Sequence, residues 1–178
     1  MKKEIEINLR EIEKKIGYTF KDKGLLAEAL THSSYANEHG GIKKHKCNER
    51  LEFLGDAVLS SITAEYLFRK YSDSPEGDLT RMRAELVCEK ALAEYSGKLG
   101  LGAVLLLGKG EERGGGRERK SILADAFEAV IAAVYLDGGI ENASKYVLSF
   151  IPKDLSLKKA VSNNDYKTIL QEVIQKNP

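Results

Sequence analysis

The amino-acid sequence is poor in tryptophan, proline and cysteine. It contains no tryptophan, three prolines and two cysteines among 178 residues. Cys47 and Cys88 do not have the spacing of a metal-ligand pair, and two such cysteines are typical of reduced thiols in a cytosolic protein. The cysteines therefore predict neither a zinc site nor a disulfide framework.

Long apolar runs and an excess of one charge are also missing. No apolar run approaches the roughly 18 residues that a membrane-spanning helix needs, and the first residues, MKKEIEINLR, lack the apolar core of a signal peptide. We therefore expect a cytoplasmic protein with no membrane partner. The formal net charge is +1, so any binding of a polyanion must depend on local clusters of basic side chains.

The composition that is present favours helices. Hydrophobic residues make up 42% and charged residues 31% of the chain, as in a globular domain with one core. Apolar residues recur at helical spacing, without the alternation of strands, so we predict an all-α helical bundle of seven to nine helices. The clearest helices are expected at residues 3–16, 48–70, 88–99 and 140–151. Asp22, and Ser74 with Pro75 as the first helical residue, are expected to start two more.

Residues 48–56, with the sequence NERLEFLGD, combine an apolar face with an acidic one. At about 100° per residue, Glu49, Glu52 and Asp56 lie within a sector of roughly 60°. The opposite face is apolar and is expected to meet the core: Leu51, Leu54, Val58 and Ile62. The carboxylates repel one another, so a hard cation would relieve the repulsion. Gly55, inside the helix, is expected to mark a close helix crossing.

Residues 121–130, with the sequence SILADAFEAV, repeat this design. Asp125 and Glu128 share one face at i, i+3. The other face is apolar: Leu123, Phe127, Val130 and Val134. Two such helices packed side by side could bring four carboxylates to one site: Glu52, Asp56, Asp125 and Glu128. Carboxylate oxygens suit Mg²⁺ or Mn²⁺ rather than zinc, so the sequence predicts a metal site formed by these four side chains.

Four motifs in order along the chain resemble the catalytic domain of the ribonuclease III family. They are LLAEALTHSSY, NERLEFLGDAVL, SPEGDLTRMRAELV and SILADAFEAVIAAVYLD, and the resemblance spans roughly residues 5–150. It implies a homodimeric, Mg²⁺-dependent endonuclease of double-stranded RNA with Glu52, Asp56, Asp125 and Glu128 as its catalytic residues. It also implies 5′-phosphate and 3′-hydroxyl products with two-nucleotide 3′ overhangs, and processing of ribosomal precursor and other structured RNAs.

Position in the helix or the family resemblance predicts a role for three further residues. Phe53 lies on the acidic side of its helix, which calls for a partner surface, and it resembles the family's aromatic residue that enters a socket on the other subunit. Glu49 is expected either to orient water, RNA or a second ion, or to form a salt bridge with a neighbouring Lys or Arg. Glu76 matches a family acidic position linked to the active region and the dimer, or it simply favours the dipole of its helix.

Two basic segments are expected beside the acidic site, one before each acidic helix. Residues 36–47 form a polar loop that either contacts phosphates or is merely solvated. Residues 109–120, KGEERGGGRERK, contain three consecutive glycines and are expected to be a mobile loop that contacts RNA, with a merely flexible loop as the alternative. The candidate RNA contacts are Lys43, Lys44, Lys46, Arg113, Arg117, Arg119 and Lys120.

The last residues suggest a second domain. We expect residues 1–152 to form the catalytic domain and residues 153–164 to form a polar linker. Residues 165–178 begin with DYKTILQE, which resembles the first helix of a double-stranded-RNA-binding domain, and such a domain would be incomplete at Pro178. The alternative is a short helix that packs on the bundle.

Two other functions and one other site are considered. A catalytically inactive double-stranded-RNA-binding protein on the same fold would generally lack some of the four carboxylates, all of which are present here. Another metal-dependent phosphoesterase would usually show paired His and Asp ligands, which the three histidines do not offer. His32 followed by Ser33 and Ser34 could suggest a nucleophile, but hydrogen bonds to the local backbone are the favoured interpretation. No organic cofactor is expected.

Overall fold

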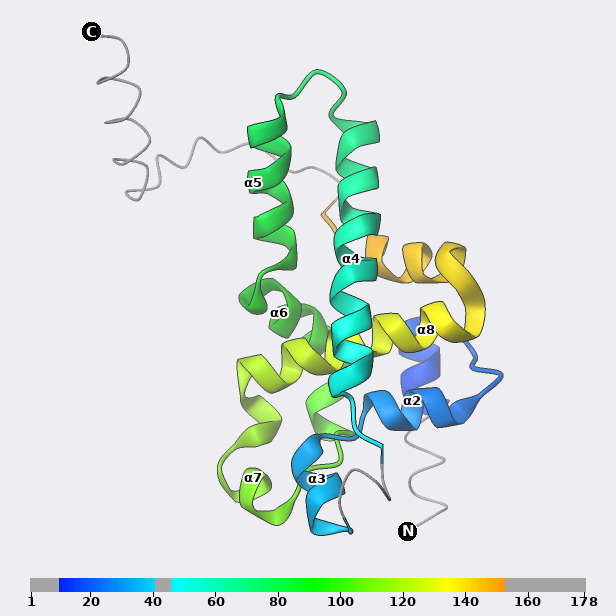
Figure 1. Ribbon diagram of the computed structural model, residues 1–178, viewed down its shortest axis with the longest axis vertical. Coiled ribbons are helices and arrows are strands. Elements are labelled where there is room, and N and C mark those ends of the chain that lie inside the picture. The colour runs from blue at the N-terminus through cyan, green and yellow to red at the C-terminus, as the bar shows by residue number, and fades with distance from the viewer. Residues whose placement is uncertain (1–9, 41–45, 153–178) are drawn as a thin grey trace, which may run out of the picture.

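The computed structural model describes residues 10–40 and 46–152, and within these ranges the regular structure is helical (Figure 1). Residues 10–16 are helical and precede the labelled elements. The α-helices that follow are α2 (Lys23–Ala29), α3 (Ser33–Glu38), α4 (Glu49–Lys70), α5 (Glu76–Val87), α6 (Glu89–Leu99), α7 (Lys109–Arg113) and α8 (Lys120–Leu148). Two 3₁₀ helices, η1 (Leu101–Ala103) and η2 (Gly116–Glu118), lie between α6 and α8. The described residues contain no β-strand beyond an isolated parallel bridge between Thr31 and Leu106, so the all-α prediction is confirmed.

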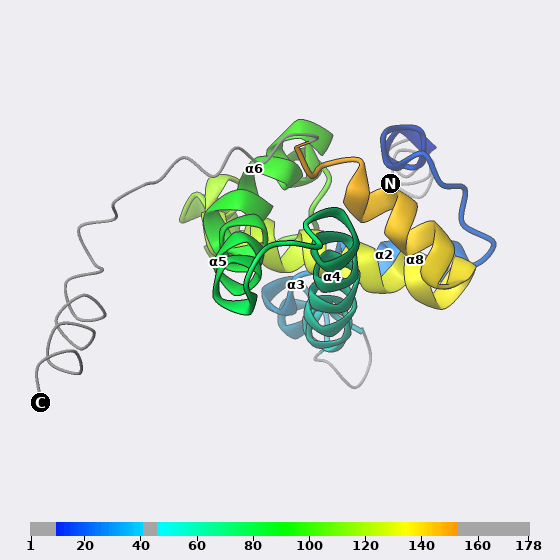
Figure 2. The same ribbon diagram turned by 90° about the horizontal axis from the view of Figure 1, so that it is seen from above.

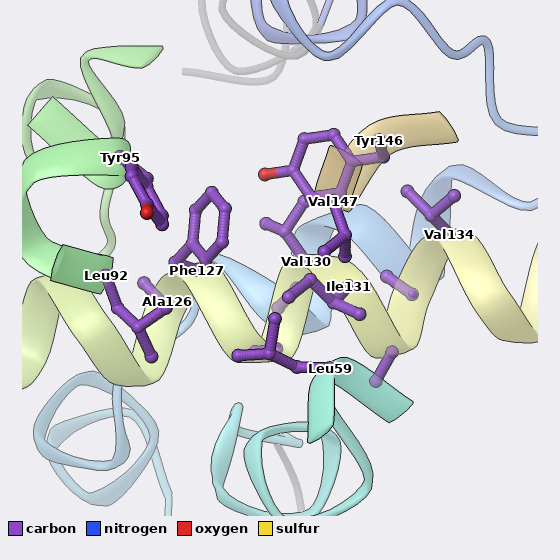
Figure 3. Close-up of a cluster of buried hydrophobic side chains, with 14 of the residues drawn as sticks. Leu59, Leu92, Tyr95, Ala126, Phe127, Val130, Ile131, Val134, Tyr146 and Val147 are labelled. Carbon is purple, nitrogen blue, oxygen red and sulfur yellow. The ribbon is translucent and has the colours of Figure 1, made fainter. Parts of the chain in front are cut away.

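Helix α8 forms the centre of the bundle, and it packs most extensively against α4 and α6. Figure 2 shows α4 and α5 side by side and nearly end-on, with α8 running across them. Phe127, Val130 and Ile131 of α8 are fully buried, and Figure 3 shows them between Leu59 of α4 and Tyr95 of α6. Small buried side chains let the other helices approach α8 closely: Ala124, Ala126, Ala129, Ala132 and Ala133.

Gly139 divides α8 into two parts that fold back on each other. Its φ of 78° and ψ of 177° lie outside the helical region and are readily available only to glycine. Just before this break, the Asp137 carboxylate accepts hydrogen bonds from the Tyr18 hydroxyl at 2.6 Å and from the backbone N–H groups of Lys21 and Asp22, each at 2.9 Å. The carboxylate thus ties the end of the long helix to the segment that enters α2.

Most of the expected helix boundaries agree with the structure, and two details were wrong. Asp22 caps α2 as predicted, through a hydrogen bond from the N–H of Gly24. Ser74 does not cap α5, because the helix starts one residue later than expected and Pro75 is its N-cap. Ile140 does not face the core but is 48% exposed, because it follows the break at Gly139. Among the described residues, no helix is both long and apolar enough to cross a membrane.

Candidate metal centre

The site forms where α4 crosses α8, and Gly55 makes this crossing possible. A Cβ atom added to Gly55 would lie 1.9 Å from the carbonyl oxygen of Glu128, which is far closer than real Cβ contacts. The absence of a side chain therefore lets the two backbones touch. The predicted close crossing is confirmed, and it brings Glu52 and Asp56 of α4 to the part of α8 that carries Glu128.

Three carboxylates meet at this crossing. Glu52, Asp125 and Glu128 each offer an oxygen atom, and these atoms all lie within 4.8 Å of one another. All three residues are partly buried. Asp56, the fourth predicted member, is exposed and lies outside this group of three, although its negative charge is felt by both Glu52 and Glu128. The structure thus places two acidic helix faces against one shared space.

The cluster strongly disfavours the ionised form of Glu128. Burial of the carboxyl group, followed by the negative charges of Asp56, Glu52 and Asp125, raises the pKa of Glu128 from its ordinary value of 4.5 to about 8. The pKa of Glu52 is also raised, first by burial and then by the charges of Asp125, Glu49 and Asp56. Without a cation, the cluster therefore holds protons that isolated carboxylates would have lost.

Asp125 experiences a more balanced environment. Burial raises the pKa of its carboxyl group, the charge of Glu89 adds to this effect, and the charge of His32 opposes it. The His32 ring also has a local structural role, because its Nδ1 lies 2.8 Å from the Ser34 Oγ and accepts a hydrogen bond from the Ser34 N–H, which caps α3. The interpretation of residues 31–35 as a locally bonded segment agrees with these contacts. The electrostatic effect on Asp125 was missed, because nothing in the local sequence shows which distant helix lies beside His32.

The described part of the chain supplies no basic partner to the cluster. Within the described ranges, no Lys or Arg forms an ion pair with Glu52, Asp56, Asp125 or Glu128. A divalent cation would stabilise the ionised carboxylates and lower their pKa values. The donor set consists of carboxylate oxygens, which suit hard cations such as Mg²⁺ and Mn²⁺. The residues present therefore fit a metal ion of this type.

Comparisons with known proteins identify the family of this chain. The family model described as Ribonuclease-III-like matches residues 22–155. Ribonuclease 3 of Clostridium perfringens is 55% identical over 175 residues, which covers 97% of this chain and 72% of the relative. The chain belongs to the ribonuclease III family. Ribonuclease 3 of Caldanaerobacter subterraneus is 53% identical over 168 residues, covering 94% of this chain and 73% of that protein.

A solved ribonuclease III structure supports the same assignment. The nuclease domain of ribonuclease III from Campylobacter jejuni superposes with a TM-score of 0.74 at 47% identity, covering 82% of this chain and 96% of that one. That structure was described for flexibility in a region involved in dimer formation. The predicted ribonuclease III helical bundle is thereby confirmed, and the chain is a ribonuclease.

Two auxiliary acidic residues of this ribonuclease III domain lie in different places. Glu49 is exposed at the start of α4, where it raises the pKa of Glu52 and interacts with the buried Cys47 thiol, whose pKa is raised chiefly by burial. Within the described residues no Lys or Arg pairs with Glu49. Glu76 lies in the first turn of α5 and accepts a hydrogen bond from the Thr80 hydroxyl at 2.7 Å. Within one chain, Glu76 is the first residue of α5 and lines a groove with Ala64 and Phe68, at the opposite end of α4 from the cluster.

The predicted RNA contacts are only partly described. Lys43 and Lys44 lie outside the described residues, and exposed Lys46 is 3.4 Å from Glu28. The prediction that residues 109–120 form a mobile loop was wrong, because this segment contains α7 and η2. Ion pairs explain the difference, since Arg117 and Arg119 turn back to acidic side chains of α7. Their predicted contact with RNA is not tested by this structure.

Proposed function

We propose that this chain is an endoribonuclease that hydrolyses phosphodiester bonds of double-stranded RNA and that requires Mg²⁺, with Mn²⁺ as a substitute. The observation that carries the proposal is the group of three carboxylate oxygens within 4.8 Å of one another, unpaired with any described Lys or Arg, in a chain of the ribonuclease III family. The metal ligands and catalytic residues proposed are Glu52, Asp56, Asp125 and Glu128.

The bound cation would supply a Lewis acid that lowers the pKa of water and neutralises charge on the phosphate. The protein contributes the arrangement of the carboxylates. Glu128 must lose its proton to act as a ligand, and its raised pKa makes this loss dependent on cation binding at neutral pH. Asp56 is exposed and is therefore the ligand that substrate approaches most directly.

Water is the attacking group in this proposal. The His32 Nδ1 and Ser34 Oγ form a close pair, but Ser34 Oγ also accepts a hydrogen bond from the backbone N–H of Gly108 at 2.9 Å. The pair is therefore engaged in holding α3 and the start of α7. In this proposal water attacks the phosphorus and the 3′ oxygen leaves, so the products carry a 5′-phosphate and a 3′-hydroxyl, with two-nucleotide 3′ overhangs on duplex products.

The protein acts as a homodimer, and each chain offers both halves of an interface. Phe53 is 82% exposed on α4 beside Glu52. At the opposite end of α4, an apolar groove of about 440 Å³ lies between α4 and α5, where Phe68 is 72% exposed. The residues lining it are Ala64, Glu65, Leu67, Phe68, Glu76, Leu79, Thr80 and Arg83. We propose that Phe53 of one copy occupies the groove of the other.

This arrangement gives Glu76 a place in the active region. Phe53 follows Glu52 directly, so a groove that receives Phe53 brings its own Glu76 towards the acidic cluster of the other copy. A two-fold dimer then has two equivalent sites, which matches the two-fold relation between the strands of an RNA duplex. One dimer can cut both strands.

The substrate is double-stranded RNA, read through its shape, its phosphates and its 2′-hydroxyl groups. We propose that ribosomal precursor and other structured RNAs are processed in the cytoplasm. Residues 1–152 form the catalytic domain in this proposal. The linker at residues 153–164 and the first helix of an RNA-binding domain at residues 165–178 lie outside the described residues and stay predictions.

The test is cleavage of a long, perfectly paired RNA at low salt, with Mg²⁺ or EDTA, by the wild type and by Glu128→Gln. We expect Mg²⁺-dependent cleavage to short duplexes with two-nucleotide 3′ overhangs, and none with Glu128→Gln. Binding without cleavage in both Mg²⁺ and Mn²⁺ would overturn the proposal and favour a catalytically inactive RNA-binding protein.

A further inference from the structure

The segment of residues 109–120 contains five basic side chains, and the structure divides four of them into two classes. Arg117 belongs to the first class, because its guanidinium is bonded within the protein. Its Nε donates to Glu112 Oε1 at 2.6 Å, and its Nη1 donates to the carbonyl oxygens of Gly102 at 2.7 Å and Leu105 at 3.0 Å. These three hydrogen bonds go to three separate groups, so they require the planar guanidinium geometry of an arginine as well as its charge.

Arg119 is held in a similar way. Its Nη1 lies 2.6 Å from Glu111 Oε1, as an ion pair without the alignment of a hydrogen bond, and its Nη2 donates to the carbonyl oxygen of Gly114 at 3.2 Å. Glu111 belongs to α7, whereas Arg119 directly precedes α8. The ion pair therefore ties α7 to the start of the helix that carries two of the clustered carboxylates.

Helix α3 holds the other end of the same segment. The backbone N–H of Gly108 donates to Ser34 Oγ at 2.9 Å, and that of Gly110 donates to Glu38 Oε1 at 3.5 Å. The backbone N–H of Lys109 also bonds to Glu38 and lowers the pKa of its carboxyl group. Segment 109–119 is thus fastened at both of its ends by side-chain hydrogen bonds and ion pairs within the chain.

Arg113 and Lys120 form the second class. Both side chains are exposed, and neither forms a hydrogen bond or ion pair with another residue in the described part of the chain. Arg113 is the last residue of α7, and Lys120 is the first residue of α8, one and a half turns before Asp125. Their charges are therefore available to an external anion.

We infer that Arg117 and Arg119 are positioning residues, and that they hold the segment so that Arg113 and Lys120 contact the phosphates of the RNA. This inference rests on the proposed function. It replaces the expectation that all four side chains contact RNA alike. The bonded pair fixes the shape of the segment, and the exposed pair supplies the attraction for the substrate.

Matched substitutions of arginine by lysine separate the two classes, because they preserve charge but remove the guanidinium fork. We expect Arg117→Lys to raise KM roughly tenfold for a short RNA duplex, with kcat at saturating RNA unchanged. Arg113→Lys is expected to raise KM less than Arg113→Gln does and far less than Arg117→Lys does, because an exposed phosphate contact accepts a point charge. Equal and negligible effects of the two changes would overturn the inference.

The salt dependence of RNA affinity is a second measurement, and a structural defect alone would not change it. Binding is measured in Ca²⁺, over a series of salt concentrations, with Lys145→Gln on the exposed second part of α8 as the charge-matched control. We expect Arg113→Gln and Lys120→Gln each to reduce the slope of log affinity against log salt by about one. Slopes equal to that of Lys145→Gln would contradict their contact with phosphate.

The Glu111–Arg119 pair allows a charge-swap test that does not depend on the folding of the Arg117 variant. Glu111→Arg adds positive charge, so simple attraction predicts tighter RNA binding, whereas the inference predicts a higher KM because two arginines then repel. The swap, Glu111→Arg with Arg119→Glu, should return KM most of the way to wild type. Tighter binding by Glu111→Arg, or a swap no better than Arg119→Glu alone, would refute the positioning role.

The wild type in the same assay separates this inference from the proposed function. If the wild type neither binds nor cleaves double-stranded RNA, the proposed function fails and the inference fails with it. If the wild type cleaves but the lysine and swap variants behave contrary to expectation, only the inference fails.

Discussion

The two ends of α4 both carry carboxylates, but in the described part of the chain ion pairs with Lys or Arg form at only one end. At the far end, Glu65 lies 2.8 Å from Arg69, and Asp78 of the adjacent α5 pairs with Arg81. At the crossing with α8, Glu52 and Asp56 have no described Lys or Arg partner. Carboxylates in ion pairs are typical of a solvated surface, whereas partly buried carboxylates without a basic partner indicate a candidate cation-binding site.

The two ends also differ in what they offer to another copy of the chain. The crossing presents a single protruding side chain, Phe53, and the far end presents an apolar groove. Neither feature is covered within the described chain. Unpaired carboxylates identify the end proposed to bind metal, and exposed apolar surface identifies the places where two copies are proposed to meet.

The largest effect is expected from Glu52→Gln, compared with Asp78→Asn at the paired end. Glu52→Gln should reduce cleavage by at least about 10³-fold, because it removes a proposed metal ligand. In the absence of metal it should preserve or raise the melting temperature, because it relieves repulsion within the cluster. Asp78→Asn loses an exposed ion pair worth roughly 0–1 kcal/mol and should retain cleavage.

Calorimetry in EDTA, with a cleavage assay in Mg²⁺, measures both effects. A clear fall in the metal-free melting temperature of Glu52→Gln would show that Glu52 is structurally paired and that the contrast between the two ends is wrong.

The second effect concerns the helix crossing itself, through Gly55→Ala compared with Gly97→Ala. The new methyl group at residue 55 would collide with the Glu128 carbonyl, so we expect a loss of about 2–3 kcal/mol in the free energy of unfolding. A methyl group at exposed Gly97 in α6 meets nothing within 4 Å and should stabilise the helix by up to ~1 kcal/mol. Urea unfolding of the metal-free proteins measures both values. Equal stabilities would mean that the crossing is not set by this contact.

The third effect tests the proposed contact between Phe53 and the apolar groove of the other copy. Phe53→Ala should weaken the dimer by about 2 kcal/mol, or roughly 30-fold in the dissociation constant, because the side chain is proposed to fill the groove of the other copy. Ile140→Ala changes another exposed apolar residue and should leave the dimer intact. Sedimentation velocity over a dilution series distinguishes the two. A dimer of unchanged affinity in Phe53→Ala would remove this residue from the interface.

The smallest effect is the pH dependence of the metal-free protein. The folded state binds the Glu128 proton more tightly than the unfolded chain does, because burial and neighbouring charges raise its pKa from 4.5 to about 8. The resulting stability is fully present below about pH 4.5 and is lost as the pH rises through about 8. Screening by solvent reduces its size to roughly 1–2 kcal/mol.

Glu128→Gln should flatten this profile of unfolding free energy against pH between 5 and 8. Saturating Mg²⁺ should flatten the wild-type profile as well, because it favours the ionised carboxylate. A slope that is unchanged by both treatments would assign the pH dependence to other groups.

The parts of this protein that the sequence predicted are those that depend on helical periodicity. The acidic and apolar faces of α4 and α8 follow from residue spacing alone, and Gly55 marked the close crossing because glycine is unfavourable inside a helix. Three of the four predicted carboxylates then meet within one small space. Periodicity also places Phe53 on the exposed side of its helix.

The errors occur where contacts between elements outweigh local preference. Three consecutive glycines predicted a mobile segment, but Arg117 and Arg119 reach back to α7 and order it. Ile140 satisfies the apolar pattern of its helix, yet the break at Gly139 turns it towards solvent.

The complete burial of residues 129–134 in α8 has a consequence for how the protein exchanges its amide hydrogens. These residues directly follow Glu128, and their amides should exchange only through global unfolding. Asp125 and Glu128 therefore lie on the slowest-exchanging unit of the chain. Local unfolding around the site should therefore be rare, and heating should abolish cation binding and the folded structure in a single transition.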